Sequence, residues 1–189
     1  MSSRTLSAIE VITLLLQASV VSSFLQTTTY PLTVVDKFTI PRTFENIATR
    51  HHGHLIVTSV TSSTLYQVSP VEEDETVAIA NIARRTRLLG IVELEQDVFY
   101  VVAVNASSQR YSWFKIHLEV ANITSAQLLN GMCRLEPNNN SMLLIADYAA
   151  GNVVKLDVET GAYEVIIDET SMKPLATGLQ VAINGIHVH

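Results

Sequence analysis

Histidine offers the most recognisable chemistry in this chain. His51, His52 and His54 stand close together, and such a group suggests metal binding. No cysteine, aspartate or glutamate accompanies them at the spacing of a known metal motif, so we interpret them as an exposed turn before a strand. His187 and His189 alternate in the sequence, which places both on one face of a strand, facing either a channel or solvent.

The remaining signatures narrow the classes of protein. Cys133 is the only cysteine, so an intrachain disulfide is excluded, and its apolar surroundings predict a buried, unreactive thiol. The GxSxG, P-loop and GxGxxG motifs are absent from the sequence, which argues against α/β-hydrolases, P-loop nucleotide enzymes and Rossmann oxidoreductases. The net charge of −6 argues against a nucleic-acid partner, because such a partner requires a basic surface.

The elements that position these residues come in repeated units. A short phrase occurs four times, as Glu45-Asn46-Ile47, Leu89-Gly90-Ile91, Asn130-Gly131-Met132 and Asn184-Gly185-Ile186. Its third residue recurs after 44, 41 and 54 positions, and an apolar run follows each of the first three copies. Self-similarity at this period predicts an array of small sheets rather than one continuous fold.

Within the units, short β-branched and aromatic runs bounded by turn residues predict antiparallel strands. The expected strands are residues 55–60, 64–69, 77–80, 98–104, 111–119, 142–146, 152–157 and 163–167. Gly151 and Gly161 predict tight turns in the third unit, because glycine readily takes a positive φ. Residues 184–189 match the start of an inner strand of a fourth unit.

The beginning of the chain differs from the rest. Residues 1–23 predict a secretory signal peptide, since Arg4 precedes an apolar stretch at 11–21 and two serines follow. An uncleaved leader is the alternative, and the stretch is too short and interrupted to span a bilayer. Residues 24–43 form a lead-in strand and linker, and 44–189 hold the repeated units.

A secreted chain can carry glycans. Three Asn-X-Ser/Thr sequons lie in predicted loops, at Asn105, Asn122 and Asn139. We therefore expect glycosylation at these positions and localisation to the secretory pathway or outside the cell. Such triplets also arise by chance, so they support secretion only in combination with the leader.

The order and spacing of the units resemble the six-bladed β-propellers of the regucalcin and gluconolactonase superfamily, and in particular its fungal branch. The phrases that carry the resemblance are Glu45-Asn46-Ile47-Ala48, Leu55-Ile56-Val57-Thr58, Asn130-Gly131-Met132, Leu144-Ile145-Ala146-Asp147, residues 151–157 and residues 184–188. The resemblance implies an all-β fold, a partial six-bladed propeller with about three blades and the first strand of a fourth. Six blades need about twice this length. We therefore expect an incomplete, truncated ring whose open edge invites self-association.

The resemblance also implies a site. In the hydrolases of this superfamily, a divalent cation in the central channel is bound by a glutamate and several Asn or Asp residues. Glu45, Asn130 and Asn184 fall on three of these positions, His187 follows in the last phrase, and the fourth ligand would lie beyond residue 189. Oxygen ligands suit calcium, which would polarise a lactone carbonyl and activate water. The alternative is that the Asn-Gly pairs only start strands and that Glu45 caps the first unit.

The fungal branch of this superfamily implies a different reaction. Some of its members are hetero-Diels–Alderases of tropolone–sesquiterpenoid biosynthesis, which hold two apolar metabolites in a reactive pose without metal or cofactor. The chain is rich in apolar strand residues, so templating of such a cycloaddition is our first expectation. The alternatives are a metal-dependent lactone hydrolase and a non-catalytic binding module or inactive remnant.

Overall fold

The computed structural model describes residues 43–71, 76–105, 110–115, 118–178 and 182–188. These residues belong to one compact unit, Val35–His189. The predicted signal peptide and almost all of the lead-in segment lie outside the described residues, so both remain predictions.

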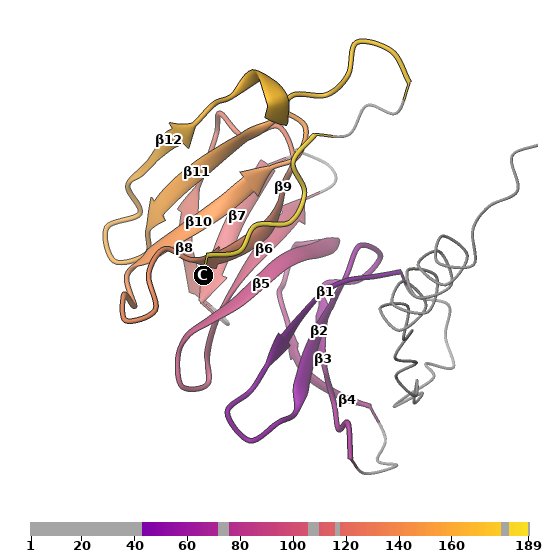
Figure 1. Ribbon diagram of the computed structural model, residues 1–189. Helices are drawn as coiled ribbons and strands as arrows, with labels where there is room; N and C mark the ends of the chain where they lie inside the picture. Colours follow the sequence, from indigo (N-terminus) through magenta and orange to yellow (C-terminus); the bar gives the residue numbers. More distant parts are fainter. Residues whose placement is uncertain (1–42, 72–75, 106–109, 116–117, 179–181, 189) are drawn as a thin grey trace, which may run out of the picture. The chain divides into compact units, whose positions relative to one another are not determined.

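The described residues form three separate four-stranded antiparallel sheets (Figure 1). The first contains β1 (Phe44–Thr49), β2 (Leu55–Ser59), β3 (Thr64–Val68) and β4 (Val77–Asn81). The second contains β5 (Arg87–Glu95), β6 (Val98–Asn105), β7 (Arg110–Lys115) and β8 (Leu118–Asn122). The third contains β9 (Leu129–Arg134), β10 (Met142–Asp147), β11 (Asn152–Asp157) and β12 (Tyr163–Ile167), and a 3-10 turn, η1 (Thr170–Met172), follows it. In each sheet the strands are neighbours in chain order, so every sheet is a meander.

The sheets pack face to face through strands that are apolar on both sides, and β6 shows this most clearly. Phe99, Val101 and Ala103 join a buried cluster that includes residues of the first sheet. Tyr100, Val102 and Val104 join a second buried cluster that includes residues of the third sheet. Because successive side chains of a strand point to opposite faces, the middle sheet is covered on both sides. The strand expected at 98–104 is confirmed, and its continuous apolar run fits this burial on both faces.

The first strands of the three sheets, β1, β5 and β9, lie side by side. Thr58 of β2 helps to join the first two sheets, because its hydroxyl donates to the carbonyl oxygen of Leu89 over 2.7 Å. At Gly90 of β5 the approach to β9 is so close that a Cβ would lie 2.0 Å from the carbonyl oxygen of Asn130. Only glycine fits there, which explains the glycine in this copy of the repeated phrase.

The first three copies of the repeated phrase therefore lie inside β1, β5 and β9, three strands that were not among those expected from the sequence. The sequence pattern did not predict these three strands, because each phrase places polar residues or glycine within the strand. The single strand expected at 111–119 is also wrong, because β7 and β8 form an antiparallel pair in which Lys115 opposes Leu118. The turns at Gly151 and Gly161 are confirmed, with φ values of 64° and 74°.

The C-terminal residues cover the free face of the third sheet (Figure 1). Ile183 and Ile186 pack against a buried cluster that contains Cys133 and Leu144. The prediction of an inner strand at 184–189 is wrong for the described residues 184–188, which have no strand assignment. The backbone hydrogen bonds here go to two different elements. Gly131 donates to the carbonyl oxygen of Asn184 and Ile183 donates to that of Met172, so a regular ladder does not form.

Candidate functional site

A pocket of about 270 Å³ lies where β1, β5 and β9 meet the C-terminal segment. Glu45, Asn130 and Asn184 all line it, so the structure brings together three of the four candidates proposed from the sequence. The other lining residues are Val60, Arg87, Leu89, Val104, Leu128 and Tyr148. The pocket thus combines one carboxylate, two amides, one guanidinium and one phenol with an apolar wall.

A hydrogen-bonded chain of side chains fixes the polar end of this pocket. The Asn130 Nδ2 donates to Glu45 Oε1 over 2.7 Å, although the two residues are 85 positions apart. Asn46 Nδ2 donates to Asn130 Oδ1 over 3.0 Å, and the Asn46 backbone N–H donates to the Thr58 hydroxyl over 3.0 Å. Because Asn130 is only 8% exposed, its amide depends on these two side chains for its hydrogen bonds when no ligand is bound.

Asn184 reaches the pocket from the C-terminal segment. The Gly131 N–H donates to the Asn184 carbonyl oxygen over 3.1 Å. A Cβ at Gly131 would lie 2.4 Å from the same oxygen, so glycine is required for this approach as well. The Asn-Gly pair at 130–131 therefore lies at the start of β9, as the second and third residues of the strand.

The oxygen atoms of this set fit a hard divalent cation. A carboxylate and amide carbonyls are the ligands that Ca²⁺ and Mg²⁺ take in proteins, with water or substrate completing the coordination. Asn130 presents its NH₂ group to Glu45, and rotation of the amide by 180° would present its oxygen instead. Glu45, Asn130 and Asn184 could thus hold a cation between them, while Arg87 and Tyr148 supply donors to an anionic oxygen.

His187 lies apart from this group. It lines a separate pocket, also of about 270 Å³, together with Cys133, Arg134 and Glu136. Cys133 is buried, as predicted, and burial raises the pKa of its thiol above the usual value. A thiol with a raised pKa is a poor nucleophile at neutral pH, so this pocket offers no activated group.

The three N-terminal histidines lie in an exposed turn, as predicted. Gly53 provides the bend with a φ of 91°, and its N–H donates to the Arg50 carbonyl oxygen over 2.8 Å. Sequence patterns did not reveal Asp97, which lies beside His51 and His52, and the potential ligand atoms of the three residues lie within 4.8 Å of one another. The repeat could have indicated that Asp97 lies near His51, because the two residues lie in the first hairpin turns of two successive units.

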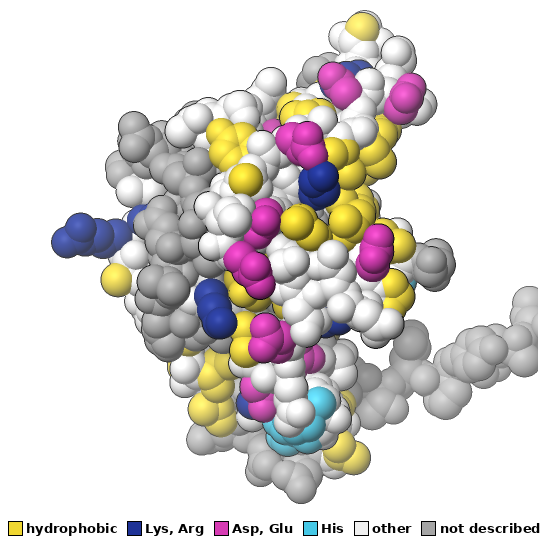
Figure 2. All heavy atoms as spheres, turned by 90° about the vertical axis from the view of Figure 1, so that its left-hand side faces the viewer, with side chains coloured by type: hydrophobic (Ala, Val, Ile, Leu, Met, Phe, Trp, Pro, Cys, Tyr) yellow, Lys and Arg dark blue, Asp and Glu magenta, His cyan; other side chains and the backbone are white. Residues whose placement is uncertain are grey.

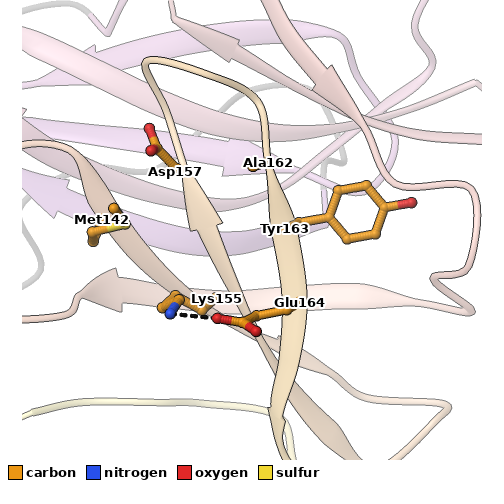
Figure 3. A pocket seen from close by; sticks show the side chains of 6 residues that line it. All are labelled: Met142, Lys155, Asp157, Ala162, Tyr163 and Glu164. Atoms are coloured by element: carbon orange, nitrogen blue, oxygen red, sulfur yellow. Dashed lines mark ion pairs between the residues drawn. The ribbon is translucent and has the colours of Figure 1, made fainter.

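A third pocket, of about 330 Å³, lies along β10, β11 and β12. Its charged groups are already engaged: Lys155 Nζ lies 2.5 Å from Glu164 Oε1, as Figure 3 shows. Asp157 accepts the backbone N–H groups of its own turn instead of facing a ligand. Tyr163 points away from the ion pair (Figure 3). This surface therefore offers no convergent set of free polar groups.

The three sequons lie at the ends of strands or in turns. Asn105 ends β6, and Asn122 ends β8, where its side chain lies outside those described. Asn139 lies between β9 and β10, and its Oδ1 accepts the backbone N–H groups of Ser141 and Met142. Glycosylation at these positions stays a prediction.

Comparison with known proteins adds no relative. No protein-family model matches this chain, and no curated protein matches it.

Among the described residues, we find no helix that is long and apolar enough to cross a membrane. The all-β architecture of three antiparallel sheets is the firm structural result.

Proposed function

We propose that the three sheets are blades of a six-bladed β-propeller of the regucalcin and gluconolactonase type. Three features support this assignment: four-stranded meanders, face-to-face stacking of successive sheets, and first strands that lie side by side. The outer strand β12 is exposed along its whole length, including Val165 and Ile167. Self-association through such an edge remains part of the proposal.

Within this architecture, we propose divalent-cation-dependent hydrolysis of a small lactone. The observation that carries the proposal is the meeting of Glu45, Asn130 and Asn184, from three distant parts of the chain, in one pocket. These three residues would hold the cation, and a bound cation supplies polarisation of the carbonyl and a water of lowered pKa. Calcium or another hard cation suits the oxygen ligands.

The other residues of the pocket have separate roles in this proposal. Arg87 and Tyr148 line the pocket and can donate hydrogen bonds to the oxygen on which negative charge develops during ring opening. Leu89, Val104 and Leu128 form an apolar wall that orients the ring of the lactone and excludes bulk water. The Asn46–Asn130–Glu45 chain holds these three side chains together at the polar end of the pocket when no cation is bound.

Templated cycloaddition of apolar metabolites is the second candidate, and the same apolar wall favours it. The size of the pocket favours a lactone over a pair of cycloaddition partners as the substrate. The pocket volume of about 270 Å³ lies below the range of about 300–1,000 Å³ for one drug-sized ligand. A hetero-Diels–Alder reaction requires room for two partners, so the pocket would have to open further. A non-catalytic binding module would keep the pocket without either reaction.

The test uses the full chain without an affinity tag and a panel of γ- and δ-lactones, followed by titration of the released acid. We expect hydrolysis that requires Ca²⁺, Mg²⁺ or Mn²⁺ and is abolished by a chelator. Glu45→Gln should reduce the rate at least 100-fold, because it removes the only carboxylate of the set. The matched control Glu159→Gln, in an exposed turn, should retain the wild-type rate.

Two results would overturn the lactonase proposal. The first is no hydrolysis above the buffer rate with any of these cations. The second is hydrolysis that Glu45→Gln leaves unchanged. Acceleration of a hetero-Diels–Alder reaction between a quinone methide and an alkene, unaffected by chelators, would establish the second candidate instead.

A further inference from the structure

Two hairpin turns of neighbouring sheets meet at one edge of the molecule. The β1–β2 turn carries His51, His52 and His54, and the β5–β6 turn carries Gln96 and Asp97. Figure 2 shows the histidine side chains gathered in one patch at the lower edge of that view, next to acidic side chains. This patch lies on different residues from the lactone pocket and does not depend on the proposed function.

The distance between the ring of His51 and the carboxylate of Asp97 is close to the distance between two ligands of one metal ion. His51 Nδ1 lies 3.6 Å from Asp97 Oδ2, which is too long for a hydrogen bond. Two ligand atoms bound tetrahedrally to one Zn²⁺, each at about 2.0–2.1 Å, lie about 3.4 Å apart. The observed separation is therefore close to that of two ligands on one ion.

Arg50 and the turn geometry hold Asp97 in this position. Arg50 Nε donates to Asp97 Oδ1 over 2.7 Å, which leaves Oδ2 directed toward His51. The Asp97 backbone has a φ of 61°, and its N–H donates to Glu93 Oε1 over 2.6 Å. Both contacts fix the carboxylate before any ligand arrives.

His51 and His52 each have a ring-nitrogen partner, and the donor and acceptor roles in both contacts depend on the tautomer. His52 Nδ1 lies 2.6 Å from His54 Nδ1, so a proton lies between the two rings. When His52 is the donor, its Nε2 is unprotonated and able to bind a metal. His51 Nε2 lies 3.1 Å from Gln96 Nε2. Rotation of this exposed amide by 180° would place its oxygen there, which would accept the Nε2 proton and leave His51 Nδ1 free to bind a metal.

We propose that His51, His52 and Asp97 form a surface binding site for a divalent transition-metal ion, with Zn²⁺ as the preferred ion. Two imidazoles and one carboxylate suit Zn²⁺, Ni²⁺ or Cu²⁺ and do not suit Ca²⁺ or Mg²⁺. Solvent completes the coordination, because all three side chains are exposed. His54 is a positioning residue that accepts the Nδ1 proton of His52.

The experiment is isothermal titration of the untagged full chain with Zn²⁺, repeated with Co²⁺ in an absorption spectrometer. We expect one equivalent of Zn²⁺ and a Co²⁺ spectrum with d–d bands of a four-coordinate site. His51→Ala and Asp97→Asn should each weaken Zn²⁺ binding at least tenfold. These exposed turn residues can be replaced without disturbing the buried clusters.

Three controls make the result specific. Glu95→Gln removes a carboxylate two residues from Asp97 and should leave the Zn²⁺ affinity unchanged. Glu45→Gln should also leave it unchanged, which separates this site from the pocket proposed above. His54→Asn, which keeps a hydrogen-bond acceptor, should retain more Zn²⁺ affinity than His54→Leu and should keep the wild-type Co²⁺ spectrum.

The proposal is overturned if the double variant His51→Ala/His52→Ala binds Zn²⁺ as tightly as the wild-type chain. It is also overturned if the wild-type chain binds less than one equivalent at millimolar Zn²⁺. A site at which Ca²⁺ competes equally with Zn²⁺ would contradict the assignment of imidazole ligands.

Discussion

Replacement of Gly90 by alanine tests the packing of β5 against β9. An added Cβ would lie 2.0 Å from the carbonyl oxygen of Asn130, whereas real Cβ contacts are essentially never shorter than 3.0 Å. The two backbones must therefore separate by about 1 Å. Overpacking of this kind costs about 1–3 kcal/mol, and we expect about 2 kcal/mol after the gain from the stiffer unfolded chain.

The assay is urea unfolding followed by circular dichroism. With an m-value of about 2 kcal/mol/M, a loss of 2 kcal/mol lowers the midpoint by about 1 M. Displacement of Asn130 should also weaken the proposed binding of a cation at Glu45. Gly185→Ala is the matched control, because a Cβ there meets no atom within 4 Å. Equal midpoints for Gly90→Ala and Gly185→Ala would refute the side-by-side arrangement of β5 and β9.

Three further predictions concern stability. Leu156→Ala should lower the free energy of unfolding by about 2–5 kcal/mol, because the Leu156 side chain is fully buried in the cluster between the second and third sheets. A loss under 1 kcal/mol in urea titration would contradict that packing. Asp147→Ala should lower the free energy of unfolding by about 3 kcal/mol, because the buried carboxylate accepts hydrogen bonds from the N–H groups of Gln127, Leu128 and Ala150. If the variant unfolds at the wild-type temperature, these hydrogen bonds do not form. Hydrogen bonds from the backbone N–H groups of Thr160 and then of Glu159 lower the pKa of Asp157. The ionised carboxylate therefore stabilises the fold above about pH 4, and this contribution disappears as the pH falls further. Asp157→Asn should be less stable than wild type at pH 7 and equally stable at pH 2, and a difference that persists at pH 2 would contradict the charge-based explanation.

The sequence predicted the later strands of each sheet better than the first strands. Apolar, β-branched runs such as 142–146 and 152–157 predicted β10 and β11 almost to the residue. The first strands were missed because Asn130-Gly131 and Leu89-Gly90 look like turn or loop sequences. Their glycines are explained only by the close approach of neighbouring backbones, which no local pattern reveals.

The candidate site was predicted in part, and the reason lies in the repeat. Glu45, Asn130 and Asn184 lie in equivalent repeated phrases, and the resemblance to the propeller superfamily implied that they meet at one site; Glu45 and Asn130 come from β1 and β9, and Asn184 comes from the C-terminal segment. His187 is only three residues from Asn184 but lines another pocket. The pairing of His51 with Asp97 was missed, because it depends on two turns that meet only when the sheets stack.

The most direct test of the central claim is a crystal structure of the full chain with bound Mn²⁺, located by its anomalous scattering. The account predicts a peak within about 2.0–2.6 Å of side-chain oxygens of Glu45 and Asn130, the range for hard cations and oxygen ligands. Absence of a peak between Glu45, Asn130 and Asn184 at saturating Mn²⁺ would contradict the account.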